Sequence, residues 1–178
     1  AMLTLSDSPD VQRRAAEQWV RANFPRIEPP PKPQARAHEK IRVGYFSADF
    51  REHPVAWLTA ELFEKHDRSR FEVYGFAFGP NDASAMRRRL TQAFDHFVDV
   101  RTLSDGQVAA RARELQIDIA VDLGGYTDAS RAGIFAARAA PVQASYVGYL
   151  GTMGAPFMDY LIADETLVAE AEIGRAHV

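Results

Sequence analysis

From residue 41 onwards, short runs of β-branched and aromatic residues alternate with segments that have a helical spacing of apolar positions. The short runs predict six strands, at Ile41–Ser47, Phe71–Phe78, His96–Val100, Ile117–Leu123, Val142–Gly148 and Tyr160–Ala163. The segments between them predict four helices, at Pro54–Lys65, Asp82–Phe94, Ser104–Leu115 and Ala129–Ala139. Strands that alternate with crossover helices form a mainly parallel sheet covered on both faces, so the predicted fold class is α/β. Such a sheet places its ligand site outside the carboxyl ends of its strands.

Two of these helices carry clear start signals. Pro54 suits a first helical turn, where no backbone donor is needed. Ser104 and Gln107, three residues apart, form the pattern of a capping box. Both signals favour the predicted helix starts.

A separate amphipathic helix is predicted within residues 1–24. Ser8-Pro9-Asp10 is a helix-start signal, and apolar residues follow near four-residue spacing, so the helix should run to about Asn23. The next stretch forbids a helix and predicts a stiff, extended linker over residues 25–40. Its prolines are Pro25, Pro29, Pro30, Pro31 and Pro33. We therefore expect a domain boundary here, with the α/β domain over residues 41–164.

Composition and charge exclude several classes of protein. The 178 residues carry a net charge of −3, which excludes a strongly basic nucleic-acid binder. The sequence has no cysteine, which excludes thiolate metal sites and cysteine nucleophiles and fits a reducing compartment. No apolar run approaches the roughly 20 residues of a membrane span, and the N-terminus lacks a signal-peptide pattern. We expect a cytoplasmic protein that binds neither nucleic acid nor membrane.

The loop Ser47–Pro54 joins the first predicted strand of the sheet to the next helix. It brings two carboxylates and an imidazole to a helix N-terminus, where backbone N–H groups favour anions such as phosphate. Asp49 or His53 could accept a proton from a hydroxyl there. The alternative, that Asp49 and His53 only cap the helix and shape the turn, fits the spacing equally well.

Two further strand-exit loops are rich in glycine. Gly124–Thr127 follows a strand that contains Asp118 and Asp122, whose separation is not that of a close metal-binding pair. We expect structural roles for both carboxylates and no catalytic metal. Gly148–Gly154 has three glycines in seven positions, which is typical of a substrate-facing loop, although simple flexibility explains this loop better.

The remaining charged clusters give weaker signals. Arg87, Arg88 and Arg89 fan around a predicted helix, which favours a solvated surface over a phosphate clamp. The histidines lack metal-ligand spacing, and among them His53 alone lies where the fold would place a ligand. They are His38, His53, His66, His96 and His177.

Seven short segments together resemble one enzyme family. They are Ile41–Phe50, His53-Pro54, Phe71–Tyr74, Gly125–Thr127, Ala140–Gln143, Gly148-Tyr149 and Met158–Tyr160. In this order they resemble the amino-terminal catalytic lobe of the O-GlcNAc transferase and SPINDLY-like glycosyltransferases, glycosyltransferase family 41. The helix and linker before them resemble the segment that joins a tetratricopeptide-repeat superhelix to that lobe.

The resemblance implies a GT-B architecture, in which two Rossmann-like lobes face each other over a cleft. It implies inverting transfer of N-acetylglucosamine from UDP-GlcNAc to Ser or Thr of a protein or peptide, with neither a metal nor a cofactor besides the donor. Asp49 would accept the proton, directly or through water, and His53 and Pro54 would line the donor and the acceptor hydroxyl. The substrate-binding residues implied by the matching segments are Pro54, Tyr126, Thr127, Val147, Gly148 and Leu150. Leu150 stands where the family usually has proline, which suggests a bacterial subfamily.

Length is the larger departure from the family. The family's uridine- and diphosphate-binding residues lie mostly on the carboxyl lobe, which residues 165–178 are too short to supply. The segment Ile173–Val178 looks like translated sequencing-adapter read-through, so we expect a truncated, inactive fragment. The donor stays open between UDP-GlcNAc, UDP-glucose and GDP-fucose.

Two other classes of function are also open. One is a receiver-like signalling module, although the first loop lacks an adjacent acidic pair and no lysine follows Val142–Gly148. The other is a non-catalytic module that binds a sugar nucleotide or a protein.

Overall fold

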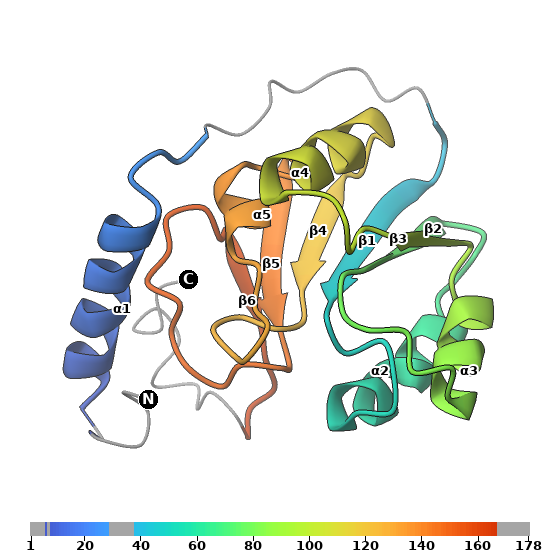
Figure 1. Cartoon of the computed structure of the whole chain (residues 1–178), viewed down its shortest axis with the longest axis horizontal. Coiled ribbons are helices and arrows are strands. Elements are labelled where there is room, and N and C mark those ends of the chain that lie inside the picture. The colour runs from blue at the N-terminus through green and yellow to red at the C-terminus, as the bar shows by residue number, and fades with distance from the viewer. Residues whose placement is uncertain (1–5, 7, 29–37, 167–178) are drawn as a thin grey trace.

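A computed structural model describes residue 6, residues 8–28 and residues 38–166 of the chain. Most of the proline-rich linker and nearly all of the tail at residues 165–178 therefore lie outside the described residues. The described part contains one six-stranded sheet in the order β3-β2-β1-β4-β5-β6, and every neighbouring pair is parallel (Figure 1). The strands are β1 (Ile41–Ser47), β2 (Phe71–Ala77), β3 (His96–Asp99), β4 (Ile119–Asp122), β5 (Val142–Tyr146) and β6 (Tyr160–Ile162). This is the doubly wound Rossmann order, whose switch point lies between β1 and β4.

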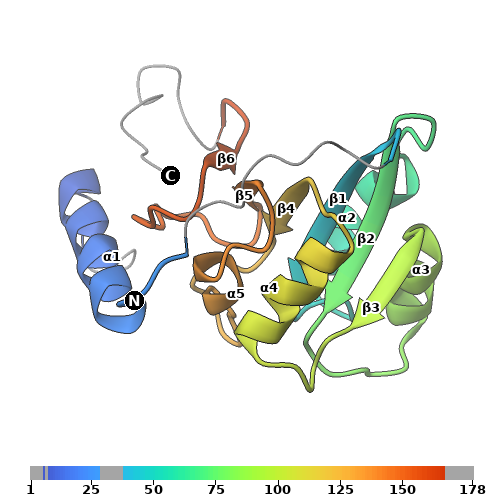
Figure 2. The ribbon, with the colours of Figure 1, turned by 90° about the horizontal axis from the view of Figure 1, so that it is seen from above.

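Two pairs of helices cover the two faces of the sheet, as Figure 2 shows. One face carries α2 (Pro54–Glu64) and α3 (Ala85–Ala93), and the other carries α4 (Asp105–Glu114) and α5 (Gly133–Ala136). Alternate residues of β1 point to opposite faces. Tyr45 packs in the core on the α2 and α3 face, and Phe46 packs in the core on the α4 and α5 face. The predicted α/β class and the parallel sheet are thus confirmed.

Aromatic rings fill the core on the α4 and α5 face. Phe46 and Phe76 stack with ring centroids 4.4 Å apart, and both side chains are fully buried. Gly44 leaves room for this stack, because a Cβ atom there would lie 3.0 Å from the Phe76 ring. These contacts fix β1 and β2 side by side at the centre of the sheet.

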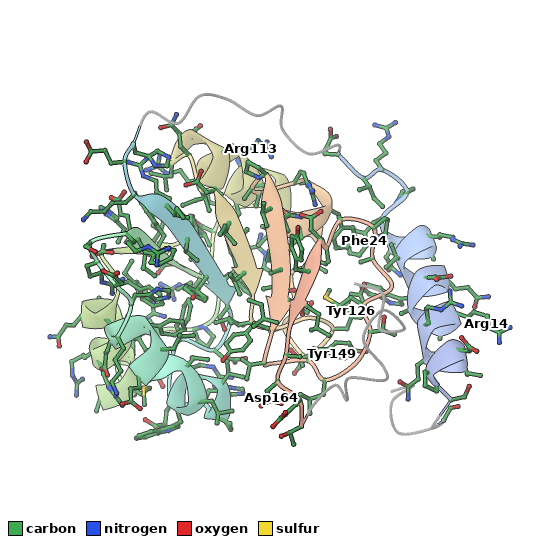
Figure 3. The ribbon with its side chains drawn as sticks, turned by 180° about the vertical axis from the view of Figure 1, so that it is seen from behind. Arg14, Phe24, Arg113, Tyr126, Tyr149 and Asp164 are labelled. Carbon is green, nitrogen blue, oxygen red and sulfur yellow. The ribbon has the colours of Figure 1, made fainter. Side chains whose placement is uncertain are left out.

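The helix α1 (Pro9–Asn23) packs beside the β6 end of the sheet (Figure 1). Its Trp19 ring lies 4.5 Å from the ring of Tyr126, and Phe24 lies 5.5 Å from Phe157. A Cβ atom at Gly154 would lie 2.9 Å from the backbone nitrogen of Glu17, so the loop after β5 also touches α1. In Figure 3, Tyr126 and Tyr149 lie on the side of the sheet that faces α1. None of the helices in the described ranges is long and apolar enough to cross a membrane.

The predicted helix starts agree with the structure at Pro54, at Ser104 and at Ser8-Pro9, where α1 begins, and differ at Asp82. Pro54 is the first residue of α2, and the Ser104–Gln107 capping box is present at α4. The helix predicted from Asp82 begins instead at Ala85, because Ser84 caps it by accepting the Arg87 N–H. Asp82 remains in the preceding loop.

Two other predictions are wrong. The helix predicted at Ala129–Ala139 is only the single turn α5, because Ala129 (φ 59°) and Arg138 (φ 56°) adopt left-handed backbone that no continuous α-helix contains. The strand predicted to reach Gly148 ends at Tyr146, because Val147 has φ 59°.

The arginine run does not form a uniformly solvated surface. Arg88 is exposed, and Arg89 pairs with Glu64 at 2.7 Å. Arg87, however, is only 7% exposed and donates to the Phe50 carbonyl at 2.9 Å. The buried stripe of α3 consists of Met86, Arg87, Leu90 and Ala93, so Arg87 lies on the inner face of the helix.

Candidate active site

The carboxyl ends of the parallel strands bring four loops to one edge of the sheet. The order of the strands places the loops after β2, β1, β4 and β5 next to one another along this edge. Two glycines allow the close approach of neighbouring loops. A Cβ atom at Gly79 would lie 1.7 Å from the Ala48 carbonyl oxygen, and one at Gly148 would lie 1.8 Å from that of Leu123. Larger residues at these two positions would separate the loops.

Asp49 lies in the loop after β1, with a side chain that is 12% exposed. Its backbone N–H donates to the Ser47 hydroxyl at 2.9 Å. Its Oδ1 accepts from the Arg51 guanidinium at 3.2 Å, and its Oδ2 lies 3.6 Å from His53 Nδ1. The loop therefore places a carboxylate, a guanidinium and an imidazole together beside the switch point. The role of Arg51 was not predicted from the sequence, although the adjacent charges at positions 49–53 could have indicated it.

His53 caps the helix that follows it. Its Nδ1 accepts the Val55 N–H at 3.3 Å, which satisfies a backbone donor of the first turn of α2. In the tautomer that allows this bond, the ring proton is on Nε2, so Nε2–H is the free donor. The imidazole side chain is 32% exposed, which leaves it accessible to a ligand. The capping role considered from the sequence is thus present. It uses Nδ1 and leaves Nε2 to contact a ligand.

Asp122 ends β4 and shapes the turn that follows. Its Oδ1 accepts the Gly124 N–H at 2.9 Å, while its buried Oδ2 has no hydrogen-bond partner among the described residues. Burial raises the pKa of Asp122 to about 6, although the N–H groups of Gly124 and Gly125 oppose the shift. The neighbouring acid of this segment, Asp118, accepts the Arg42 N–H at 2.8 Å with its Oδ2. Both carboxylates have the structural roles predicted for them.

Tyr126 and Thr127 continue this turn. The Tyr126 hydroxyl donates to the Met153 carbonyl at 2.8 Å, so this side chain ties the loop after β4 to the loop after β5. Burial raises the pKa of Tyr126 above its ordinary value. Thr127 is exposed, and its hydroxyl donates to the Gly124 carbonyl at 2.7 Å. Thr127 therefore presents a side chain at the rim, whereas the Tyr126 ring lies between Trp19 and Tyr149.

The loop after β5 holds three of the predicted substrate-binding residues. Val147 is a β-branched residue with φ 59°, a conformation that costs about 1–3 kcal/mol and is often found at functional sites. The Gly148 N–H donates to the Tyr146 carbonyl at 2.8 Å, which closes a tight turn at this point. Leu150 follows with 68% of its surface exposed, so an apolar side chain projects from the carboxyl edge.

A buried polar network holds the far end of this loop. Gln143 is fully buried, and its Nε2 donates to the carbonyls of Phe135 and Phe157. Arg138 donates to Asp159 Oδ1 at 2.8 Å, and Asp159 Oδ2 accepts the Gln143 N–H at 2.8 Å. No role was predicted for these residues from the sequence, although Gln143 and Asp159 lie in two of the segments that resemble the family, Ala140–Gln143 and Met158–Tyr160.

A cavity of about 330 Å³ lies between α1 and the segment after β4. Trp19, Tyr126 and Thr127 contribute to its wall. Its charged residues pair with each other, since Arg131 Nε lies 2.7 Å from Asp105 Oδ1. Within the described residues, no group of three or more His, Asp or Glu side chains could hold a metal ion.

Comparison with known proteins gives matches over most of the chain. The model of glycosyl transferase family 41 matches residues 27–173. A probable UDP-N-acetylglucosamine–peptide N-acetylglucosaminyltransferase, SEC from Arabidopsis thaliana, is 39% identical over 71% of this chain and 13% of its own length. A UDP-N-acetylglucosamine–peptide N-acetylglucosaminyltransferase from Caenorhabditis elegans is 40% identical over 71% of this chain and 11% of its own length.

The fold also matches a solved structure. A mutant of the Thermobaculum terrenum O-GlcNAc transferase superposes with a TM-score of 0.82 and 34% identity, over 88% of this chain and 30% of that chain. The chain thus spans a small part of the relatives that it matches. The family model covers far more than half of the chain, and the chain belongs to glycosyl transferase family 41.

Proposed function

We propose that residues 41–164 are the amino-terminal catalytic lobe of a GT-B enzyme that transfers N-acetylglucosamine from UDP-GlcNAc to Ser or Thr hydroxyls of a protein or peptide. The proposal rests on the position of the Asp49 carboxylate, which lies beside an imidazole at the carboxyl edge next to the β1–β4 switch point. The names of the Arabidopsis and C. elegans relatives support this donor and this class of acceptor.

In the proposed reaction, the acceptor oxygen attacks the anomeric carbon of the donor from the face opposite to UDP. The new C–O bond forms as the bond to the β-phosphate oxygen breaks, so the configuration inverts. The hydroxyl proton passes to Asp49, directly or through one water molecule. The Arg51 guanidinium, 3.2 Å from Asp49 Oδ1, keeps the carboxylate oriented.

The other site residues bind and orient the substrates in this proposal. His53 Nε2–H donates to the donor sugar or to the acceptor hydroxyl, and Pro54 lines the same side. Thr127, Val147, Gly148 and Leu150 line the other side, and Tyr126 holds their two loops together through its bond to Met153. The UDP leaving group is held by a carboxyl lobe outside this chain, without a metal. The Thr127 hydroxyl exchanges its bond to Gly124 for a substrate oxygen.

The proposal has three further parts, which concern location, subfamily and the region before the lobe. We place the protein in the cytoplasm, supported by a sequence without cysteine. We place it in a bacterial subfamily, supported by Leu150 at a position where the family usually has proline. We propose that α1 and the proline-rich linker join a tetratricopeptide-repeat region to the catalytic lobe. The support is that this segment resembles the one that joins the repeats to the lobe in the family.

Transfer of radiolabelled N-acetylglucosamine from UDP-GlcNAc to a mixture of Ser- and Thr-containing peptides tests the function. The 178-residue chain alone should give no transfer, because stabilisation of the departing diphosphate is the largest electrostatic task and its donors lie on the other lobe. The same chain joined to the rest of its gene product should transfer the sugar. No transfer by the joined protein would contradict the proposal, and phosphorylation of the chain by acetyl phosphate would support the receiver-like alternative instead.

A further inference from the structure

The loop after β1 is held in place by the segment that leads into α3. The Arg87 side chain reaches across from α3 and donates through Nη1 to the Phe50 carbonyl at 2.9 Å. Its guanidinium also lies 4.5 Å from the centre of the Phe97 ring. Arg87 is only 7% exposed, and burial lowers its pKa. Because burial of a cation costs free energy, an apolar residue would suit simple packing better here.

Asp82 makes a second contact with the backbone of the same loop, two residues after Phe50. Asp82 Oδ2 accepts the Glu52 N–H at 2.8 Å, and Asp82 Oδ1 accepts the Ser84 N–H at 3.1 Å. The Glu52 N–H is the main cause that lowers the pKa of Asp82 to about 2. Asp82 is therefore ionised at neutral pH, where it is the stronger acceptor.

The contacts at Phe50 and Glu52 lie on either side of Arg51, the residue that pairs with Asp49. Within the described residues, the other hydrogen bonds of this stretch join neighbours in the sequence. The Asp49 N–H donates to the Ser47 hydroxyl, and the Arg51 N–H donates to the Asp49 carbonyl at 2.7 Å. Bonds between residues two positions apart shape a loop, but they do not fix its position relative to the sheet.

We propose that Arg87 and Asp82 are positioning residues that hold the Asp49–His53 loop in its catalytic geometry. The part that concerns catalysis rests on the proposed function. The two residues touch the backbone of the loop, and neither acts on the substrate. This role explains why the Arg87 cation is buried on the inner face of α3. It also means that the loop after β2, which holds Asp82, helps to position the site.

Hydrogen exchange of the 178-residue chain tests the structural part without any transferase activity. Arg87→Ala and Asp82→Ala should each speed amide exchange across residues 49–55 by about tenfold, as expected for the loss of one hydrogen bond. Arg88→Ala is the matched control, because Arg88 is the next residue on the same helix, is exposed, and donates to the Ala83 carbonyl. It should leave exchange across residues 49–55 unchanged.

Kinetics of the joined protein test the catalytic part. Arg87→Ala should lower kcat by about 10–100-fold, as misplacement of a catalytic group does, and should change the KM for UDP-GlcNAc less than twofold. Arg87→Lys should recover a large part of kcat, because lysine also offers a donor to the Phe50 carbonyl. Asp82 is exposed, so Asp82→Ala should fold and lower kcat even if Arg87→Ala does not fold.

Two results would overturn the proposal. One is that amide exchange across residues 49–55 is as slow in both Arg87→Ala and Asp82→Ala as in the Arg88→Ala control. The other is unchanged kcat in the folded variants. A joined wild-type protein without transfer would instead contradict the proposed function, and the exchange experiment would still decide whether Arg87 and Asp82 hold the loop.

Discussion

His53 Nδ1 lies 3.3 Å from the Val55 N–H nitrogen that it caps and 3.6 Å from Asp49 Oδ2. One ring nitrogen thus caps the start of α2 and lies beside the candidate catalytic carboxylate. The arrangement fixes the direction of the imidazole and leaves Nε2 free. It also means that a change at His53 affects the stability of the helix and the chemistry of the site together, so the two effects must be separated by the choice of substitution.

Asn and Ala at position 53 separate these two roles. Asparagine is a good N-cap, so His53→Asn should keep the melting temperature close to that of the wild type, whereas His53→Ala should cost about 0.5–2 kcal/mol of stability. If the imidazole binds substrate, both variants should lose turnover in the joined protein and raise KM. Thermal melts and steady-state kinetics check this. Normal kcat/KM in His53→Asn would show that the histidine is only a cap.

Asp122 predicts a stability that depends on pH. Its folded-state pKa is about 6 and the ordinary value is 3.8, so the folded state binds the proton more tightly. The contribution of protonated Asp122 to the free energy of unfolding is therefore fully present below about pH 4. It is lost as the pH rises through 6, by up to about 3 kcal/mol. Asp122→Asn removes this ionisation and keeps the acceptor for the Gly124 N–H. The variant should melt several degrees above the wild type at pH 8 and close to it at pH 4.

The control for this prediction is Asp128→Asn. Asp128 lies in the same loop, is exposed, and accepts the Ala129 N–H with its side chain. This variant should leave the melting temperature unchanged at both pH values. A difference between Asp122→Asn and the wild type that stayed constant with pH would contradict the assignment of a raised pKa to Asp122.

Trp19 provides a measure of how firmly α1 is attached to the loops of the site. Its ring lies 4.5 Å from Tyr126, and an aromatic pair of this kind contributes about 0.5–1.5 kcal/mol beyond its buried area. Trp19→Ala should therefore lower the melting temperature by about 1–6 °C in a chain of this size. Trp57→Ala is the control, because Trp57 is 60% exposed on α2. Equal melting temperatures for Trp19→Ala and Trp57→Ala would mean that the Trp19–Tyr126 contact adds no stability.

The sheet was predictable from the sequence because its signals are local. Apolar runs such as Ile41–Ser47 and start signals such as Pro54 and Ser104 depend on neighbouring residues alone. The clustering of Asp49 and His53 followed from their place after a strand. The left-handed backbone of Val147 and Arg138 was not predictable, because residues of these types rarely adopt a positive φ and nothing in their side chains signals it.

Arg87 is an intermediate case. Its charge suggested an exposed position, but Met86, Leu90 and Ala93 define a buried stripe that includes position 87. The helical period could therefore have indicated that one arginine of the three points inward. Its partner, the Phe50 carbonyl, is 37 residues away in the sequence and carries no signal in the residue type.

The turnover of Asp49→Asn in the joined protein tests whether the Asp49 carboxylate accepts the proton of the acceptor hydroxyl. Asparagine keeps the shape of the side chain and removes the charge that accepts the proton. If Asp49 accepts the proton, kcat for transfer from UDP-GlcNAc to peptide should fall by about 10²–10⁴-fold, with an unchanged melting temperature and little change in the affinity for the donor. Asp67→Asn, an exposed carboxylate in the turn before β2, should leave kcat at the wild-type value. A folded Asp49→Asn protein with near-normal kcat would contradict the role of Asp49 as the proton acceptor.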